Sequence, residues 1–402
     1  MVMDRLFTLM AEKKASDIFL APGSPIHIKI NGLSIPINQQ KLDAEGVERL
    51  LQEILTERQW QEFQERRELN TGYGLRGVGS FRINVFRQRG APACVVRYIP
   101  SDIPALDSLK LPPLLSELVM EKRGLILVVG STGSGKSTTL AAMLDYRNEL
   151  RSGHILTFED PIEFIFRNKR SIVHQRQIGT DTDSLAVGLK NAMRQAPDCI
   201  LIGEIRDMET MSAAIAYAQS GHLVLSTLHA NNANNALNRI VSFYPPENRR
   251  VMQADLAATL KAVVSQRLVN SAAGPRIAAV ELLLNTRLVS ELIEQGQLTE
   301  VKDAMEKSLA PGSQTFEQAL VRLVRAGTIS RQDALAHADS PTNLLWLLEN
   351  ADAELPASPE RPSAQPLPQL GGAGPAGAPG KPPGKPGDAP DGGDFSEILL
   401  NV

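Results

Sequence analysis

The segment Gly130–Thr138 reads Gly-Ser-Thr-Gly-Ser-Gly-Lys-Ser-Thr and constrains the fold of this chain more than any other. It follows the apolar run Leu125–Val129, typical of a buried strand, and precedes the helix-forming segment Thr139–Leu150. With the spacing G-x-x-x-x-G-K-S, this order brings backbone N–H groups toward phosphate oxygens at the positive end of a helix. A merely tight strand-to-helix turn would not require the lysine. The sequence therefore predicts nucleotide binding.

The polar side chains of this segment each suit a role at a nucleotide. Lys136 is expected to reach the outer phosphates, and the Ser137 hydroxyl is expected to ligate Mg²⁺. The residues predicted to bind the nucleotide are Gly130, Ser131, Thr132, Gly133, Ser134, Gly135, Lys136, Ser137 and Thr138.

Composition limits the classes of protein that remain. The chain has 402 residues and a net charge of −3, so it is expected to hold two or more domains and shows no electrostatic signature of nucleic-acid binding. Its two cysteines, Cys94 and Cys199, are far apart, which predicts neither a disulfide framework nor a zinc site. The N-terminus does not resemble a secretory signal, and no apolar run is long enough to span a bilayer. We expect a cytoplasmic protein that meets membranes only peripherally.

Four regions differ in their pattern. Residues 1–99 predict a small α+β domain, and the proline-punctuated residues 100–113 predict a linker. Residues 114–350 predict an α/β domain that ends in helices. Residues 351–402 are dominated by Pro, Gly and Ala, which predicts a disordered tail. The apolar end of that tail, Phe395–Leu400, is either a docking peptide or an uninvolved chain end.

Within the second domain, apolar runs alternate with helical patterns, as in a parallel sheet covered by helices. We further expect a helix over Leu256–Leu268 and another strand over Gly274–Leu284. The four runs predicted to form parallel strands are Leu125–Val129, His154–Phe158, Cys199–Ile202 and Leu223–Ser226.

Charged residues gather where these predicted strands end. Glu204 ends one strand and is expected to face the Mg²⁺ position beside Ser137, because the carboxyl ends of parallel strands meet at one crevice. The alternative is a capping or surface role. Glu159, Asp160 and Glu163 follow another strand, and one of them is a candidate to activate the attacking water.

Four further side chains are candidates with weaker signals. His222 and His229 lie at either end of one predicted strand, where they could sense a phosphate, link subunits or be merely structural. They are too far apart for a short-range metal motif. Arg82 and Arg97 lie in alternating strands of the first domain, where exposed arginines are ordinarily solvated. In a motor that stacks this domain on a neighbour's nucleotide, they would serve as arginine fingers.

Together these residues resemble the type IV pilus and type II secretion ATPase superfamily. The resemblance covers residues 1 to about 350 and rests on four boxes in order. The boxes are Gly130–Thr138, Glu159–Glu163, Leu201–Asp207 and Gly221–Asn231. It implies an α/β fold with a PAS-like N-terminal domain and a RecA-like C-terminal ATPase domain, arranged as a homohexamer that binds ATP and Mg²⁺.

The same resemblance assigns catalytic roles. It implies that Glu163 is the catalytic glutamate and that Glu204 is the Walker B glutamate. His222 and His229 match a histidine box, and Arg82 and Arg97 match arginines that the N-terminal domain presents.

Within the superfamily the chain resembles the retraction ATPases of the PilT and PilU groups, because it lacks an additional N-terminal domain and the four-cysteine zinc module. PilT proteins carry a motif A-I-R-N-L-I-R, whereas the matching stretch here is Leu288–Glu294, with both arginines replaced. This departure, together with Gln314–Leu320 and Asp333–Ser340, favours the PilU group. The resemblance implies a PilT-type ATPase and an inner-membrane pilus platform protein as partners, at the base of the pilus machine.

Several alternatives stay open. The nearest is a PilT-type motor that retracts pili by itself, and another is a secretion or assembly ATPase. A ring subunit that binds nucleotide without hydrolysing it is disfavoured by the intact Lys136, Glu163 and Glu204. A nucleic-acid translocase is disfavoured by the net charge.

Overall fold

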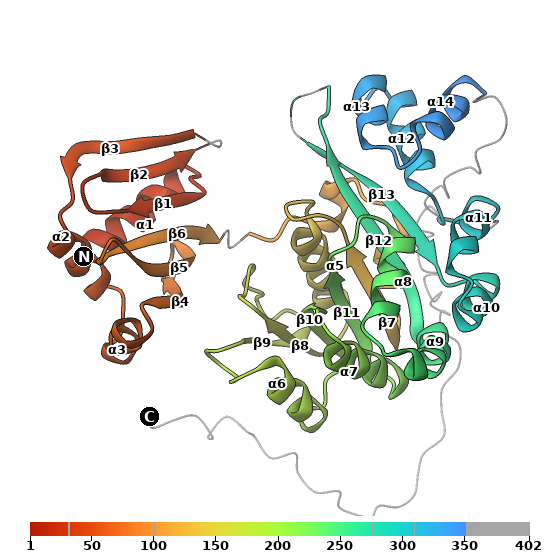
Figure 1. Ribbon diagram of the computed structural model, residues 1–402, viewed down its shortest axis with the longest axis horizontal. Helices are drawn as coiled ribbons and strands as arrows, with labels where there is room; N and C mark the ends of the chain where they lie inside the picture. Colours follow the sequence, from red (N-terminus) through yellow and green to blue (C-terminus); the bar gives the residue numbers. More distant parts are fainter. Residues whose placement is uncertain (31–32, 100–101, 273, 275, 309, 351–402) are drawn as a thin grey trace, which may run out of the picture. The chain divides into compact units, whose positions relative to one another are not determined.

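The computed structural model describes residues 1–30, 33–99, 102–272, 274, 276–308 and 310–350. Within these residues the chain forms two β-sheets, a six-stranded one near the N-terminus and a seven-stranded one later in the chain (Figure 1). The prediction of a disordered tail over residues 351–402, and of a docking peptide at its end, concerns residues outside this set. No helix of the described part combines the length and apolarity that a membrane crossing needs.

The N-terminal sheet is antiparallel throughout, with the strand order β3-β2-β1-β6-β5-β4. Its strands are β1 (Asp17–Leu20), β2 (Pro25–Ile30), β3 (Leu33–Lys41), β4 (Glu68–Leu75), β5 (Gly79–Gln88) and β6 (Ala91–Ile99). Alternate residues of β5 are buried, as in a sheet with one solvated face. Phe81 from this buried face stacks on Phe7 of α1 with 4.2 Å between ring centroids.

Three helices also contribute to this N-terminal core: α1 (Val2–Glu12), α2 (Ala44–Gln52) and α3 (Glu57–Arg66). Local chemistry sets where two of them begin. Asp43 accepts a hydrogen bond from the Gly46 amide at the start of α2, and Thr56 forms a capping box with Gln59 at the start of α3.

The second sheet has the order β13-β12-β7-β11-β10-β8-β9 and is parallel except for β13. Its strands are β7 (Gly124–Val129), β8 (Gly153–Glu159), β9 (Ser171–Gln177), β10 (Cys199–Glu204), β11 (Leu223–Leu228), β12 (Leu260–Val269) and β13 (Ile277–Leu284). The four predicted parallel strands are all confirmed and lie side by side, with β7 beside β11. The strand predicted over Gly274–Leu284 is confirmed as β13.

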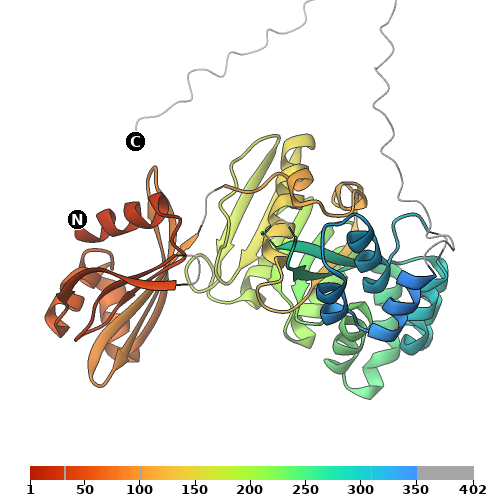
Figure 2. The same cartoon turned by 90° about the horizontal axis from the view of Figure 1, so that it is seen from above.

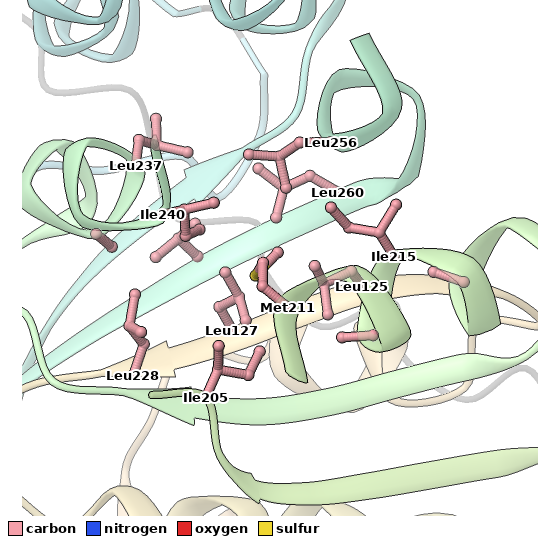
Figure 3. Packing of buried hydrophobic residues seen from close by; sticks show 14 of the residues in the cluster. Leu125, Leu127, Ile205, Met211, Ile215, Leu228, Leu237, Ile240, Leu256 and Leu260 are labelled. Atoms are coloured by element: carbon pink, nitrogen blue, oxygen red, sulfur yellow. The ribbon is translucent and has the colours of Figure 1, made fainter. Parts of the chain in front are cut away.

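Helices cover both faces of this sheet. On one face, Leu125 and Leu127 of β7 pack with Met211 and Ile215 of α7 in a large apolar cluster to which α8 and α9 also contribute (Figure 3). On the other face, Ile126 and Val128 pack against α4 and α5. These helices are α4 (Leu114–Leu118), α5 (Lys136–Leu150), α6 (Leu185–Ala192), α7 (Met208–Gln219), α8 (Ala233–Ser242) and α9 (Pro246–Thr259).

The helix predicted over Leu256–Leu268 is wrong for most of its length. Helix α9 ends at Thr259, and the chain continues as β12, which pairs with β7 on one side and β13 on the other. The β-branched Val263 and Val264 suit a strand, and the two neighbouring strands satisfy the backbone there. Pairing between distant segments therefore overrides the local helical pattern.

Five α-helices follow the sheet within the described residues: α10 (Arg287–Gln295), α11 (Val301–Glu306), α12 (Phe316–Arg325), α13 (Arg331–His337) and α14 (Pro341–Glu349). Helices α12 to α14, drawn in blue, group together beside β12 and β13 (Figures 1 and 2). Phe316 and Leu320 of α12 and Leu344 of α14 share an apolar cluster with Val269 at the end of β12. These three helices are called the C-terminal helical group below.

Candidate functional site

At two positions of the loop between β7 and α5, the backbone conformation and the close neighbours leave room only for glycine. Gly130 has φ +153°, and a Cβ there would lie 2.4 Å from Ser134 Oγ and 2.5 Å from the Gln266 carbonyl oxygen. Gly135 has φ +91°, and a Cβ there would lie 2.9 Å from Gln266 Nε2. The loop therefore folds tightly over the end of β7 and packs against β12.

The polar groups of this loop fit an anionic ligand. The Lys136 ammonium donates hydrogen bonds to the carbonyl oxygens of Gly130 (2.9 Å) and Ser131 (2.8 Å) and so lies inside the loop. Burial lowers the pKa of Lys136, while the charges of Glu204 and, to a smaller extent, Glu163 act in the opposite direction. The Ser134 hydroxyl is buried and has no hydrogen-bond partner among the described residues. A tight glycine loop with an inward lysine and an unsatisfied hydroxyl is a suitable cradle for phosphate.

Glu204 is the last residue of β10 and lies between two cationic or potentially cationic groups. Its Oε2 accepts a hydrogen bond from Arg206 Nε at 2.7 Å, and its Oε1 lies 3.2 Å from His229 Nε2. The hydrogen bond to Glu204 raises the pKa of Arg206. Three side chains from the ends of β10 and β11 are thus held together at the crevice beside the loop.

The three carboxylates after β8 have different environments. Glu159 is buried and accepts hydrogen bonds from Thr157 Oγ1 (2.6 Å), Gln175 Nε2 (3.1 Å) and the Glu163 amide. Burial raises the pKa of Glu159. Glu163 is exposed, and its charge acts on Lys136. Glu159 thus fixes the turn, whereas Glu163 remains available to a ligand.

The two candidate histidines lie at opposite ends of β11, as the sequence predicts. His229 follows the carboxyl end of the strand and reaches Glu204. His222 precedes the amino end, where its Nδ1 lies 3.0 Å from Ser220 Oγ and 3.1 Å from the Tyr217 carbonyl oxygen. A strand of six residues separates the two rings by roughly 20 Å. Within one chain the structure therefore brings His229, but not His222, to the loop.

Arg82 and Arg97 are directly paired residues on β5 and β6. Both lie on the sheet face opposite the buried Phe81, Ile83 and Val96. Arg97 Nε donates to Asp17 Oδ1 at 2.9 Å. Because like charges directly across a ladder are unfavourable, this pair is suited to contact with an anion.

Two residues that the sequence reasoning did not assign also belong to this region. Gln266 on β12 accepts a hydrogen bond from Thr139 Oγ1 at 2.8 Å and touches the loop at both of its outer glycines. Arg206 holds Glu204. Arg206 lay within a recognised box, but Gln266 is marked only by being polar in an apolar run, a signal too weak to use alone. No group of three or more His, Cys, Asp and Glu among the described positions is arranged to hold a metal ion.

Comparison with known proteins identifies the class. Residues 2–279 match the family model described as "Type II/IV secretion system protein". The chain belongs to this family and is a P-loop ATPase.

Individual relatives narrow the assignment. The chain is 46% identical to the type IV pilus ATPase PilU of Pseudomonas aeruginosa over 350 residues, which cover 87% of this chain and 92% of that protein. It is 37% identical to PilT of the same organism over 85% of this chain and 100% of that one. A crystal structure of the pilus retraction motor PilT with bound ADP superposes with a TM-score of 0.81 at 38% identity, covering 86% of this chain and 99% of that one. Within its family the chain is thus a motor ATPase of the PilT and PilU type.

Proposed function

We propose that this chain hydrolyses ATP with Mg²⁺ as a homohexameric ring, and that hydrolysis powers or assists the retraction of type IV pili. The observation that carries the proposal is that Lys136, Glu163, Glu204 and His229 line one cavity with the glycine-rich loop. The likeness to PilT with bound ADP supports a nucleotide in that cavity.

Each polar group has a role that suits its position. Gly130–Thr138 would hold the phosphates, with Lys136 turning from the loop carbonyls to the outer phosphate oxygens. Mg²⁺ would take the Ser137 hydroxyl directly and Glu204 directly or through water, since this ion commonly keeps waters and substrate phosphates as ligands. When bound, it would neutralise charge that develops on the transferring phosphoryl group. Glu163 would orient and deprotonate the attacking water.

The two candidate arginines would act between subunits. Arg82 and Arg97, on the solvated face of the N-terminal sheet, would reach the nucleotide of a neighbouring subunit as arginine fingers. His222 lies at the far end of β11 from Glu204, so any catalytic part for it would also require a neighbour.

We propose a domain organisation to match. Residues 1–99 would form a PAS-like domain, residues 100–113 the linker, and residues 114–350 a RecA-like domain with its C-terminal helices. The six-stranded antiparallel sheet with helices on one face supports the first assignment, and the mainly parallel sheet with helices on both faces supports the second.

We further propose a PilU-like role beside a PilT-type motor, at the inner-membrane platform of the pilus machine. Identity to PilU is higher than to PilT in the same organism. In α10, Ser290 and Glu294 occupy the two positions where PilT proteins carry arginines. Helix α10 therefore lacks two arginines that PilT proteins carry. This difference from PilT proteins supports a role that the chain shares with a PilT-type partner.

The test is Mg²⁺-dependent ATP hydrolysis by the purified chain beside Glu163→Gln, with the mass of both assemblies measured. Hydrolysis by a hexamer that disappears in the variant is the expected result. A hexamer that binds ATP without hydrolysing it would overturn the enzymatic part and leave a coupling subunit. Full activity in the variant would remove Glu163 from its assigned role.

The retraction role needs a cellular test. A strain that lacks a retraction motor keeps its pili or gains more, whereas loss of an assembly or secretion ATPase removes fibres. Deleting this gene should therefore leave pili present while twitching motility falls. Absence of pili would contradict the proposal.

A further inference from the structure

Two consecutive residues of β12 point to opposite faces of the sheet and reach different parts of the molecule. Gln266 lies against the glycine-rich loop, with its backbone carbonyl next to Gly130 and its side-chain amide next to Gly135, and it accepts a hydrogen bond from Thr139. Arg267 extends from the other face, because successive side chains of a strand alternate. The same short piece of strand thus touches the nucleotide loop on one side and a second set of groups on the other.

Arg267 makes its contacts with the C-terminal helical group. Its guanidinium lies 3.8 Å from the centroid of the Phe316 ring, at the start of α12. It forms an ion pair with Asp339, between α13 and α14, and donates a hydrogen bond to the carbonyl oxygen of His337 at the end of α13. Arg267 and Asp339 are only 18% and 20% exposed, so this pair is shielded from solvent more than an ordinary surface salt bridge.

The same pair also holds the loop that follows His229. Arg267 donates to the Asn231 carbonyl oxygen at 3.1 Å, and Asp339 Oδ2 accepts from Asn232 Nδ2 at 2.9 Å. Asn232 in turn caps α8 by accepting a hydrogen bond from the Asn235 amide. The loop from His229 to Asn232 is therefore tied to Glu204 at one end and to the Arg267–Asp339 pair at the other.

We propose that Arg267 and Asp339 are positioning residues for ATP hydrolysis: they set the loop that carries His229 against Glu204, and they couple its position to the C-terminal helical group. Neither residue touches the nucleotide position. Nucleotide binding that shifts the loop by a small amount changes the contacts of Asp339 and thereby moves or loosens α13 and α14. The inference rests on the proposed nucleotide site, and it adds the route by which the site communicates with the end of the described chain.

The test is hydrogen–deuterium exchange on the full chain with and without Mg²⁺-ADP, for wild type, Asp339→Ala and Arg331→Ala. In wild type we expect ADP to slow exchange at 130–138 and to change it at 331–349. Asp339→Ala should keep the first response and lose the second. Arg331→Ala is the matched control, because Arg331 pairs with Glu349 at 3.1 Å in the same helical group but makes no described contact with the His229 loop.

The outcomes separate the two proposals. No response at 130–138 in wild type would contradict nucleotide binding itself. A response at 130–138 with none at 331–349, or an equal response at 331–349 in Asp339→Ala, would overturn the coupling alone. Retained protection at 130–138 also shows that the variant is folded.

Kinetics provide the second readout. Asp339→Ala should lower kcat about tenfold while KM for ATP stays within about twofold, because the pair acts on the loop and not on nucleotide binding. Asp339→Asn keeps an oxygen that can accept from Asn232 and should recover part of the loss. Equal kcat in wild type and Asp339→Ala would refute a positioning role.

Discussion

The two sheets of this protein expose chemistry in different ways. The antiparallel N-terminal sheet is covered on one face only, so residues in the middle of its strands, such as Arg82 and Arg97, face outward. The mainly parallel sheet is covered on both faces, so its strands β7 and β11 are buried throughout. Its functional candidates, Lys136, Glu204 and His229, lie where strands end.

This difference predicts how each sheet can contribute to a reaction. Strand ends of a parallel sheet converge on one crevice and can build a complete binding site within a chain. A solvated sheet face builds no cavity, and its side chains act only when another surface covers them. The first sheet should thus affect hydrolysis only in the assembled protein, and the second should determine nucleotide binding in each chain.

The largest effect should come from the loop at the end of β7. Lys136→Ala removes the one ammonium buried in the loop and should weaken ATP binding by roughly 10²–10³-fold and abolish turnover. Isothermal titration with ATP measures the change. Lys169→Ala is the control. Lys169 pairs with Asp145 of α5 at 2.9 Å, away from the loop, so this variant should bind ATP as wild type does. Normal affinity in Lys136→Ala would show that the loop does not hold phosphate.

On the N-terminal sheet, Arg82→Ala should lower kcat of the assembled protein by about 10³-fold if it acts as an arginine finger, with little change in ATP affinity. Asn84→Ala, two residues along on the same face, should leave kcat unchanged. Arg82 is a cleaner test than Arg97, because removing Arg97 also deprives the buried Asp17 of its cationic partner. An equal loss of ATP binding in Arg82→Ala would contradict an action between subunits.

Buried carboxylates sharpen the comparison in terms of stability. Asp17 in the first sheet is paired with Arg97, whereas Glu281 in the second accepts hydrogen bonds from the neutral Ala233 amide (2.6 Å) and Ser265 hydroxyl (2.9 Å). Burial raises the pKa of Glu281 to about 7, the charge of Asp339 adds to this, and that of Arg267 opposes it. Below the pKa that Glu281 has in the unfolded chain, this carboxyl group is neutral in both the folded and the unfolded state. The folded protein then bears no free-energy cost from a buried charge at this position.

Stability should therefore fall as pH rises from about 4.5 to about 7 and then level off, because the folded state holds the proton longer. Glu281→Gln keeps an acceptor oxygen without the charge. It should match wild type near pH 5 and exceed it at pH 8 by on the order of 3 kcal/mol of unfolding free energy. Denaturant unfolding at both pH values measures this. A difference that does not grow with pH would show that the carboxyl group is not held neutral.

The sequence predicts the individual parallel strands of the second sheet better than it predicts the contacts between distant segments of that sheet. Apolar runs and the G-x-x-x-x-G-K-S spacing are local patterns, so the four parallel strands and the loop could be placed from them. The local pattern of most of β12 predicts a helix, because its identity as a strand depends on pairing with β13 and with β7, which is distant in the sequence. The contacts of Gln266 and Arg267 follow from that pairing, so they cannot be predicted from the local sequence either.

In the N-terminal sheet, the sequence does not predict β4, because its outward positions include Gly72 and Gly74, which weaken the strand pattern although Leu69, Tyr73 and Leu75 alternate on the inner face. The outward face of Arg82 and Arg97 could be predicted, since a two-residue period fixes which side chains share a face. That the two arginines are direct neighbours could not, because this register is set by the exact two-residue turn between Gln88 and Ala91, which the apolar pattern alone does not locate.

The smallest effect should separate the two ends of β11. His229→Ala removes the imidazole 3.2 Å from Glu204 and should lower kcat about tenfold, whereas His222→Ala should stay within about twofold of wild type. His222 is hydrogen-bonded to Ser220 and Tyr217, so its loss should instead lower the melting temperature by a few degrees. Steady-state hydrolysis measures kcat of both variants, and thermal unfolding measures their melting temperatures. A tenfold loss of kcat in His222→Ala would mean that the amino end of this strand also serves catalysis, and a neighbouring subunit would then be needed to bring it to a nucleotide.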